Sequence, residues 1–305
     1  MTFPGKIKKG LKRPNIVLLK LWQRSSRLIT NDRLYLSVAY FMSHLRRIRW
    51  KQPVTFNEKT MWLKLWSKGR GFELYVDKYE VRSYVAGKIG EKYLIPMLGV
   101  WDSLDEIDFS QLPENYVLKT THDSGGVAIV HGSLTPESRH LLEKHLRFNY
   151  FYRGREYPYK NTRPRIIAEK LMVDESGWDL KDYKIFCFNG EPKILFTASE
   201  RFKTKGGKAK FDYFDMDLVR LPFSSAGHEA AYNTGEKHPP IAGFEEMKSL
   251  ARKLSEGFPF IRIDFYDING RVYFGEMTFF HDDGMVPILP YEWDVRLGEM
   301  ISLPR

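Results

Sequence analysis

Four polar side chains near the C-terminus have the types and spacing of a cation-binding site. Residues 261–278 contain two runs rich in aromatic and β-branched residues around a short turn, a pattern typical of a β-hairpin. The first run carries Arg262 and Asp264, and the second carries Glu276 and Thr278. Two carboxylates that converge from adjacent strands repel each other unless a cation lies between them, and their oxygens suit Mg²⁺. The simpler alternative is a solvent-facing hairpin with an ordinary Arg–Glu cross-strand pair.

The turn decides whether these carboxylates meet. A two-residue turn at Asn269-Gly270 is the obvious prediction, but in a regular ladder it directs Glu276 to the face opposite Asp264. A three-residue loop, with a type I turn followed by a left-handed glycine, pairs Asp264 with Phe274 and Arg262 with Glu276. All four polar residues then share one face. We therefore predict the three-residue loop, with a positive φ at its glycine.

Composition indicates a globular protein without a membrane span. The chain has 305 residues, of which 43% are hydrophobic and 15% aromatic, enough for a sizeable core in one large domain or in two to three lobes. Its one cysteine, Cys187, excludes an internal disulfide and fits a reducing compartment. We find no signal-peptide pattern and no apolar run long enough to cross a bilayer. These features predict a cytoplasmic protein.

The net charge of +10 is concentrated at the N-terminus. Residues 1–52 contain 13 Lys and Arg and a single acid, Asp32, whereas the remaining residues carry 35 bases and 37 acids. A basic block of this kind can bind an anionic membrane surface, a polyanionic glycan or nucleic acid, or it can simply be solvated. Nucleic acid is the least favoured partner, because no nucleic-acid motif accompanies the block.

Helical periodicity and capping signals predict the elements of the first third. The apolar run 16–22 between basic residues fits an interfacial helix. A second helix is expected from Asp32 as its N-cap, with core positions at Leu34, Val38, Phe41, Met42 and Leu45. Thr55-Phe56-Asn57-Glu58 is a capping box that opens a third helix. Tyr93-Leu94-Ile95-Pro96 is then expected to be a strand, so we predict a mixed α/β unit for residues 53–112.

The middle of the chain contains a predicted strand–loop–strand that could hold phosphates. Residues 116–120 and 127–130 read as strands around a loop with Ser124, Gly125 and Gly126, and Lys119 lies at the end of the first strand. Backbone N–H groups of such loops can enclose phosphate oxygens. A further strand ends at Glu169-Lys170-Leu171-Met172.

Two later segments complete the pattern. A hairpin is predicted for 182–188 and 192–196, in which Asp182 and Lys184 share one face, and a helix is predicted around Met247 to Leu254. Residues 201–243 form a long, loop-rich insertion that contains Asp215-Met216-Asp217.

These segments, in this order, resemble the ATP-grasp enzymes, and more narrowly the TupA-like branch associated with teichuronopeptide and other surface-polysaccharide gene sets. The resemblance covers roughly residues 53–290. The motifs that carry the resemblance are Thr55-Phe56-Asn57-Glu58-Lys59, Asp77-Lys78-Tyr79, Tyr93-Leu94-Ile95-Pro96, Asn115-Tyr116-Val117-Leu118-Lys119 and Gly275-Glu276-Met277-Thr278-Phe279-Phe280. It implies an α+β ATP-grasp fold with the nucleotide between two α+β lobes. We expect a basic helical segment at 1–52, an α/β unit at 53–112, a small lobe at 113–172 and a large lobe at 173–305.

The resemblance also implies roles for individual residues. In the small lobe, Lys119 would contact phosphates, Ser124, Gly125 and Gly126 would cover them, Glu169 would accept from the adenine amino group, and the backbone of Lys170, Leu171 and Met172 would read the ring edge. In the large lobe, Asp264 and Glu276 would hold Mg²⁺, Arg262 would offset phosphoryl charge, and Lys184 would approach phosphate or the acceptor carboxylate. Thr278 stands where many ATP-grasp enzymes have Asn, and its hydroxyl can still bind metal or phosphate. His281-Asp282-Asp283-Gly284 replaces the usual Pro-Gly segment.

By this resemblance the protein is an ATP- and Mg²⁺-dependent ligase that joins a carboxylate and an amine through an acyl phosphate. The expected partners are an amino acid or peptide and a uronic-acid or amino-sugar glycan, free or lipid-linked, in capsule or other polysaccharide biosynthesis. Residues 1–52 would place it at the inner membrane face. The alternatives are a glycosyltransferase that uses Asp215-x-Asp217, an ATP-grasp-like sugar kinase, and a non-catalytic glycan-binding module.

Overall fold

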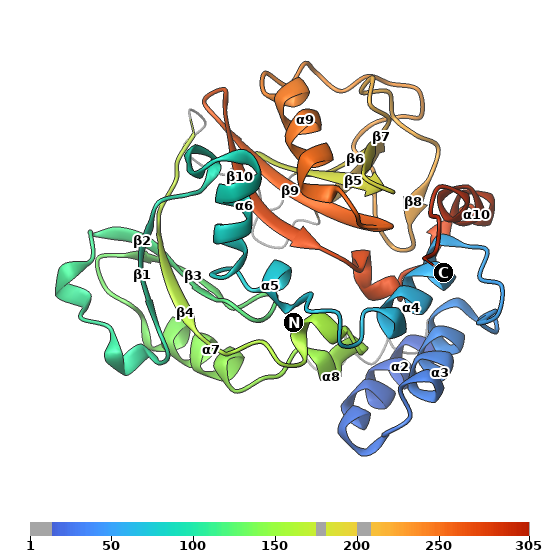
Figure 1. Ribbon diagram of the computed structural model, residues 1–305, viewed down its shortest axis with the longest axis horizontal. Coiled ribbons are helices and arrows are strands. Elements are labelled where there is room, and N and C mark those ends of the chain that lie inside the picture. The colour runs from blue at the N-terminus through green and yellow to red at the C-terminus, as the bar shows by residue number, and fades with distance from the viewer. Residues whose placement is uncertain (1–13, 175–180, 200–208, 305) are drawn as a thin grey trace.

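The computed structural model describes residues 14–174, 181–199 and 209–304. Within these residues, two antiparallel sheets face each other across a central helical layer, and a helical hairpin projects from one side (Figure 1). The small-lobe sheet has the order β1-β4-β2-β3, and the large-lobe sheet has the order β10-β9-β5-β6-β7. The strands are β1 Met97–Trp101, β2 Asn115–Thr120, β3 Val127–His131, β4 Ile166–Lys170, β5 Lys181–Phe188, β6 Glu191–Ser199, β7 Lys210–Phe214, β8 Ser224–Ser225, β9 Phe260–Ile268, β10 Arg271–Thr278 and β11 Ile288–Leu289. The α-helices are α2 Pro14–Arg24, α3 Asp32–His44, α4 Phe56–Trp66, α5 Glu73–Val76, α6 Val81–Ile89, α7 Pro136–Leu146, α8 Phe151–Gly154, α9 Phe244–Ser255 and α10 Tyr291–Glu299.

The small-lobe sheet presents one apolar face to α7. Alternate residues of β2, Tyr116 and Leu118, are buried with Leu142 of α7, as the period of two along a strand requires. The predicted strands 116–120 and 127–130 are confirmed as β2 and β3. The expected strand at 93–96 is wrong, because the chain is a 3₁₀ turn at Glu91–Tyr93 and strand pairing begins only at Met97.

The large-lobe sheet is covered by α9. Its helix face of Met247, Leu250, Ala251 and Leu254 is buried against the sheet, as predicted from the periodicity. The β5–β6 hairpin is also confirmed, and Cys187 lies buried within it as a free thiol. Burial of this apolar face stabilises the lobe, because removal of apolar surface from water is the dominant favourable term in folding.

Helices α4 to α6 connect the two lobes. The Thr55 side chain accepts from the backbone of Glu58, and the Glu58 carboxylate accepts from the backbone of Thr55, so the capping box of α4 is confirmed. Phe56 and Val85 belong to the core of the large lobe, whereas β1 is hydrogen-bonded to β4 of the small lobe. The elements within residues 53–112 therefore pack partly on the large lobe and partly on the small lobe. The limits of the four units expected from the sequence stay a prediction.

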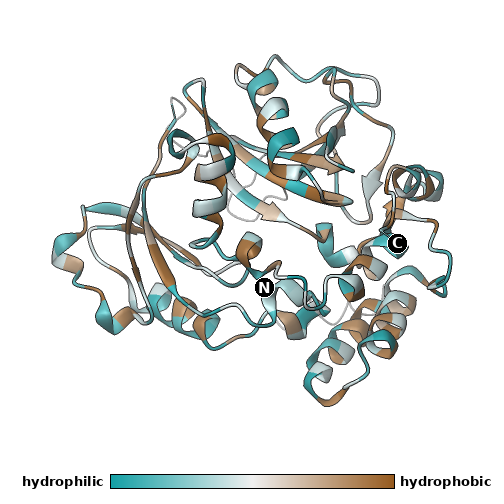
Figure 2. Ribbon diagram, viewed as in Figure 1, coloured by the Kyte–Doolittle hydropathy of each residue, from teal (hydrophilic) through white to brown (hydrophobic). Residues whose placement is uncertain are grey.

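The helices α2 and α3 form the projecting hairpin. The N-cap of α3 is Asn31, whose side chain accepts from the backbone of Leu34, rather than the predicted Asp32. The expectation that all of its apolar positions lie in the core is wrong. Leu34, Phe41 and Leu45 are 52%, 50% and 65% exposed, because α3 packs on α2 and α4 through Tyr35, Leu36, Ala39 and Tyr40 instead. Figure 2 shows hydrophobic segments along both helices of this hairpin.

The insertion at 201–243 contains more regular structure than expected. β7 extends the large-lobe sheet by pairing with β6. Asp215 accepts from the backbone N–H groups of Asp217 and Val219, at 3.0 and 2.8 Å, so its carboxylate stabilises a turn. None of the described helices is long and apolar enough to span a membrane.

Candidate active site

The hairpin β9–β10 brings Asp264 and Glu276 together by a route that the sequence did not reveal. The strands are joined by a two-residue turn, with φ of 54° at Asn269 and 78° at Gly270, so the predicted three-residue loop is wrong. The predicted positive φ of Gly270 is confirmed. A β-bulge between Phe274 and Glu276 adds one residue to β10 and places Glu276 opposite Asp264. The expected shared face is therefore present with a different register, in which Thr278 lies opposite Arg262.

Arg262 links the two carboxylates. Its Nε and Nη2 donate to the two oxygens of Asp264 at 2.7 and 2.8 Å, and Nη2 also donates to Glu276 Oε1 at 2.9 Å. The Thr278 hydroxyl donates to the same Glu276 oxygen at 3.2 Å. Asp264 is buried, whereas the Glu276 side chain is 44% exposed. Glu276 is thus the carboxylate that a ligand can reach from solvent.

Lys184 on the neighbouring strand β5 completes this charged group. Its Nζ donates to Asp264 Oδ2 and to Asp182 Oδ2, both at 2.6 Å, which confirms that Asp182 and Lys184 share a face. Burial opposes ionisation of Asp264, but the charges of Arg262 and Lys184 outweigh it and hold the pKa of Asp264 below its ordinary value. The Asp264 carboxylate is therefore ionised at neutral pH.

The donor set fits a hard divalent cation that is also bound by substrate phosphates. The described residues contain no cluster of three or more His, Cys, Asp or Glu arranged as metal ligands. Mg²⁺ needs only one or two carboxylates when phosphate oxygens and water supply the remaining positions. Asp264 and Glu276 supply two carboxylates, and in the structure Arg262 balances their negative charge.

The predicted nucleotide residues of the small lobe also lie together. Lys119 Nζ donates to Glu169 Oε2 at 2.7 Å, and Arg82 Nη1 donates to Glu169 Oε1 at 3.1 Å. The backbone N–H of Lys170 donates to the carbonyl of Pro96 at 2.9 Å. This N–H belongs to the segment expected to bind the adenine ring, and in the structure it already has a backbone partner. Met172 packs against the end of the β9–β10 hairpin.

The loop with Ser124, Gly125 and Gly126 is held by a buried carboxylate. The side chain of Asp123 accepts from the Thr120 hydroxyl and contacts Nδ1 of His145 on α7. A side chain at Gly126 would collide with Thr120, and Gly125 has a φ of 100°. The glycines are therefore required by the close approach of the backbone and by its conformation.

Lys78 belongs to the motif Asp77-Lys78-Tyr79, and no role was predicted for it from the sequence. Its Nζ donates to the carbonyl of Asp123 below the glycine loop, and burial lowers its pKa against the opposing charges of Glu276 and Asp123. It lines a small polar cavity of about 20 Å³ in which residues of both lobes meet. The lining residues are Lys78, Arg82, Leu94, Lys119, Glu169, Phe274 and Gly275. The motif Asp77-Lys78-Tyr79 was the sequence signal that could have identified Lys78 as a site residue. No sequence signal indicated Arg82.

The turn that follows β10 carries a second group of charges. His281 Nδ1 lies 3.3 Å from Arg262 Nη1, and burial lowers the pKa of His281 to about 4, so its ring is neutral. Lys64 of α4 donates to the Asp283 carbonyl at 2.7 Å and also pairs with its carboxylate. Burial, reinforced by Asp283, raises the pKa of Glu156 well above its ordinary value. This turn joins the carboxylate pair to α4.

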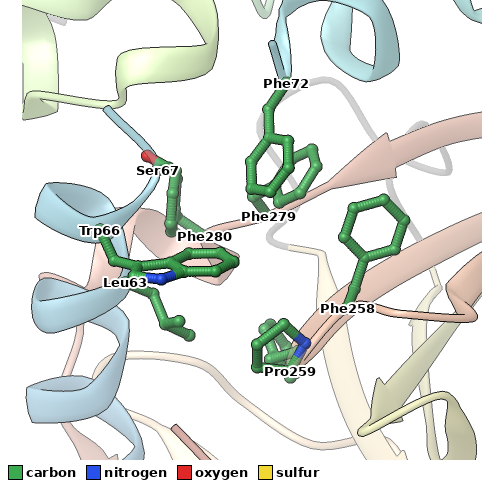
Figure 3. A pocket seen from close by; sticks show the side chains of 9 residues that line it. Leu63, Trp66, Ser67, Phe72, Phe258, Pro259, Phe279 and Phe280 are labelled. Atoms are coloured by element: carbon green, nitrogen blue, oxygen red, sulfur yellow. The ribbon is translucent and has the colours of Figure 1, made fainter. Parts of the chain in front are cut away.

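An apolar pocket lies between α4 and the strand ends of the large lobe (Figure 3). Its lining residues are Leu63, Trp66, Ser67, Phe72, Phe258, Pro259, Phe260, Phe279 and Phe280. It contains no ionisable side chain, so the charged groups of Lys78 and Glu276 form the better candidate for chemistry.

Comparisons with known proteins identify the family of this chain. The chain matches the family described as TupA-like ATPgrasp over residues 58–302. No curated protein matches. Among solved structures, it is similar to D-alanine–D-alanine ligase from Bacillus anthracis, with 17% identity, a TM-score of 0.41, and coverage of 75% of this chain and 66% of that chain. The corresponding ligase from Helicobacter pylori has 18% identity and a TM-score of 0.35, with coverage of 76% of this chain and 62% of that chain. D-cycloserine synthetase DcsG has 16% identity and a TM-score of 0.40, with coverage of 88% of this chain and 77% of that chain.

The chain spans slightly less than two thirds of the length of these two D-alanine–D-alanine ligases. The family match extends from α4 to the segment after α10 and includes both lobes. The fold is the predicted α+β ATP-grasp fold, preceded by a helical N-terminal region. The chain belongs to the TupA-like ATP-grasp family.

Proposed function

We propose that this protein is an ATP- and Mg²⁺-dependent ligase that joins a carboxylate to an amine. The observation that carries the proposal is the pair Asp264 and Glu276, which face each other through Arg262. Lys78 lines a small cavity together with Lys119 of the small lobe, and the charge of Glu276 acts on its pKa. Carboxylates for a metal and cations for phosphates on facing lobes are what phosphoryl transfer requires.

The reaction has two steps. A carboxylate oxygen of the acceptor attacks the γ-phosphorus of ATP, the bond to the leaving ADP oxygen breaks, and an acyl phosphate forms. The amine then attacks the acyl carbon, the C–N bond forms, phosphate leaves, and the nitrogen loses a proton. No side-chain nucleophile is needed.

Different side chains serve metal binding, phosphate binding, adenine binding and orientation of the acceptor. Mg²⁺ held by Asp264 and Glu276, with Thr278 beside them, would neutralise phosphate charge. Lys78 and Lys119 bind phosphate oxygens beneath the loop of Ser124, Gly125 and Gly126 once Lys119 leaves Glu169. Glu169 accepts from the adenine amino group, with Lys170, Leu171 and Met172 along the ring edge. Arg262 stabilises the transferring phosphoryl group, and Lys184 orients the acceptor carboxylate.

The acceptor that fits best is a glycan with uronic-acid or amino-sugar units, free or lipid-linked, to which an amino acid or peptide is joined during synthesis of a surface polysaccharide such as a capsule. The TupA-like family membership and the basic N-terminal segment support this assignment. A sugar kinase would use the same phosphate site and differs only in its product. A glycosyltransferase at Asp215-x-Asp217 gains no support, because Asp215 is engaged in its own turn.

The test is product analysis with the full-length protein, ATP and Mg²⁺. A uronic acid and an amino acid together should release ADP and phosphate and give an amide that mass spectrometry detects, and hydroxylamine should trap the acyl phosphate as a hydroxamate. A phosphorylated sugar would instead indicate a kinase, and turnover of a nucleotide sugar without ADP would indicate glycosyl transfer. Either result would overturn the ligase.

We also propose that the enzyme is cytoplasmic and lies at the inner membrane face. Val17, Leu18 and Leu21 of α2 are exposed beside Lys20 and Arg24. Leu34 and Phe41 are exposed two turns apart on α3, and the exposed Leu45 follows as its C-cap. Apolar side chains flanked by bases are the composition of interfacial helices on anionic lipids. Residues 1–13 of this basic segment lie outside the described residues.

A further inference from the structure

A cavity of about 390 Å³ lies between the N-terminal helices and α4, apart from the residues of the nucleotide site. Its lining residues are Arg33, Trp50, Lys51, Trp62, Leu65 and Trp66. Its volume falls in the range of small-ligand sites, roughly 300–1,000 Å³. Three of the seven tryptophans of the chain meet here, and no acidic side chain lines the cavity.

Two exposed cations line the cavity, and neither is paired with a carboxylate in the described part of the chain. The guanidinium of Arg33 lies 5.4 Å from the ring of Trp50, and neither Arg33 nor Lys51 has an ion-pair partner among the described residues. Trp50 Nε1 donates to Ser37 Oγ at 2.8 Å, which fixes that ring. By contrast, Nε1 of Trp66 is shielded from solvent and without a partner in the described part of the chain. That donor is inaccessible, so the two exposed cations beside the aromatic rings are the groups that favour a ligand with anionic oxygens.

We propose that this cavity binds an acidic saccharide, that is, a glycan segment that carries carboxylates. The C–H faces of sugar rings pack against indole rings, their hydroxyl and carboxylate oxygens accept hydrogen bonds, and carboxylates pair with Arg33 and Lys51. An apolar ligand would leave both cations unpaired. Residues 1–13 contain five bases and no acid, so their charge does not complement the cavity.

The position of the cavity links it to the proposed reaction. Trp66 lines both this cavity and the apolar pocket of Figure 3, whose lining also includes Phe279 and Phe280. These two residues directly follow Thr278 at the end of β10. α4 also carries Lys64, which binds Asp283 in the turn after β10. A glycan bound to the tryptophans would thus lie on the helix that holds the turn after β10, next to the strand that carries Glu276; this link to the reaction rests on the proposed function.

Single-stranded nucleic acid is the competing ligand, because bases also stack on aromatic rings beside cations. Such binding uses successive rings along a groove that follows the charged backbone. In this protein the three tryptophans and two cations line a single open cavity, which fits a compact saccharide better.

The test measures binding of trigalacturonic acid to the full-length protein without ATP, by calorimetry and tryptophan fluorescence. The methyl-esterified trimer is the neutral control, and oligouridylate is the nucleic-acid control. We expect the acidic trimer to bind at least tenfold tighter than the ester, with a change in fluorescence. Equal affinity for the ester, no binding of the acidic trimer, or tighter binding of oligouridylate would each overturn the proposal.

Matched variants locate the ligand. Arg33→Ala with Lys51→Ala should weaken trigalacturonate binding at least tenfold, because both carboxylate partners are lost. Lys193→Ala with Lys253→Ala removes the same charge from two exposed positions elsewhere and should leave the affinity unchanged. An equal loss in both double variants would indicate non-specific charge attraction and overturn the site. Trp62→Phe should weaken both trimers.

Measurements of amide formation distinguish a failure of the saccharide cavity from a failure of the proposed ligase activity. If the double variant of Arg33 and Lys51 forms the amide product with an unchanged KM for an acidic oligosaccharide, the cavity is not its binding site, although the ligase stands. If trigalacturonate binds as expected but no acyl phosphate or amide forms with any acceptor, the cavity stands and the ligase fails. We expect a raised KM with an unchanged kcat.

Discussion

Glu276 lies opposite Asp264 because Gly275 is an extra residue in β10. A regular ladder from the same two-residue turn would turn Glu276 to the other face. A Cβ at Gly275 would lie 3.1 Å from the carbonyl oxygen of Asp264, so this bulge tolerates a side chain poorly. Gly270, in contrast, has open space around it and only its positive φ to favour glycine.

The first prediction compares these two glycines. Gly275→Val should disturb the bulge, misplace Glu276 and abolish most nucleotide turnover. Gly270→Ala should cost about 1 kcal/mol of stability through its backbone conformation and leave turnover per folded molecule unchanged. Chemical denaturation and ADP release measured on both variants check this. Wild-type turnover in Gly275→Val would show that the bulge does not position Glu276.

The hairpin also shows what sequence alone could and could not predict. The capping box at Thr55 and the face of α9 depend on neighbours in sequence, so both were predicted correctly. The shared face of Asp264 and Glu276 was expected, but from the wrong turn, since a bulge has no clear sequence signal beyond one glycine. The contacts of Lys78 arise where two lobes meet, which no local pattern encodes. The stripe of α3 was amphipathic as predicted, yet periodicity cannot tell which partner an apolar face meets.

The second prediction concerns the carboxylate pair. Glu276→Gln should lower Mg²⁺-dependent turnover roughly 100-fold, as expected for loss of a group that stabilises transition-state charge, with little change in stability because the side chain is half exposed. Asp264→Asn should lose turnover too, but it leaves Arg262 and Lys184 short of a buried partner and should cost about 3–5 kcal/mol. Steady-state kinetics at several Mg²⁺ concentrations, with denaturation curves, separates the effects. Full activity in either variant would contradict the metal assignment.

The third prediction concerns the phosphate cations. Lys119→Ala or Lys78→Ala should each weaken ATP binding by about 1.5–3 kcal/mol, the value of one charge-assisted hydrogen bond. Lys193→Ala is the matched control, since that side chain is exposed on β6 and has no part in the proposed nucleotide site. Calorimetric titration with ATP and Mg²⁺ provides the affinities. If the control loses as much affinity as Lys119→Ala, the effect is one of general charge.

The fourth prediction is a pH dependence of stability from Asp294. Its Oδ1 accepts from the backbone of Asn57 at 3.0 Å, and burial raises its pKa from 3.8 to about 6. The folded state therefore holds a proton that the unfolded state releases, and its stabilising contribution is lost as the pH rises from about 4 through 6. Asp294→Asn should gain stability relative to wild type over this window, by up to about 3 kcal/mol, and the difference should level off above it. Denaturation at a series of pH values provides the test, and a constant difference would exclude Asp294 as the titrating group.

The last prediction concerns the membrane surface of the helical hairpin. Leu34→Ser with Phe41→Ser removes two exposed apolar side chains from α3, each worth roughly 1.5–3 kcal/mol when fully buried in an apolar phase. Binding to vesicles that contain phosphatidylglycerol should therefore fall at least tenfold, with little loss of stability. Ile129→Ser, at a position 58% exposed on β3, removes a comparable side chain far from the basic segment and should bind as wild type does. Co-sedimentation provides the measurement, and binding should also weaken with added salt or with neutral lipid, because the bases of α2 and α3 contribute by charge. Unchanged binding of the double variant would exclude α3 from the membrane contact.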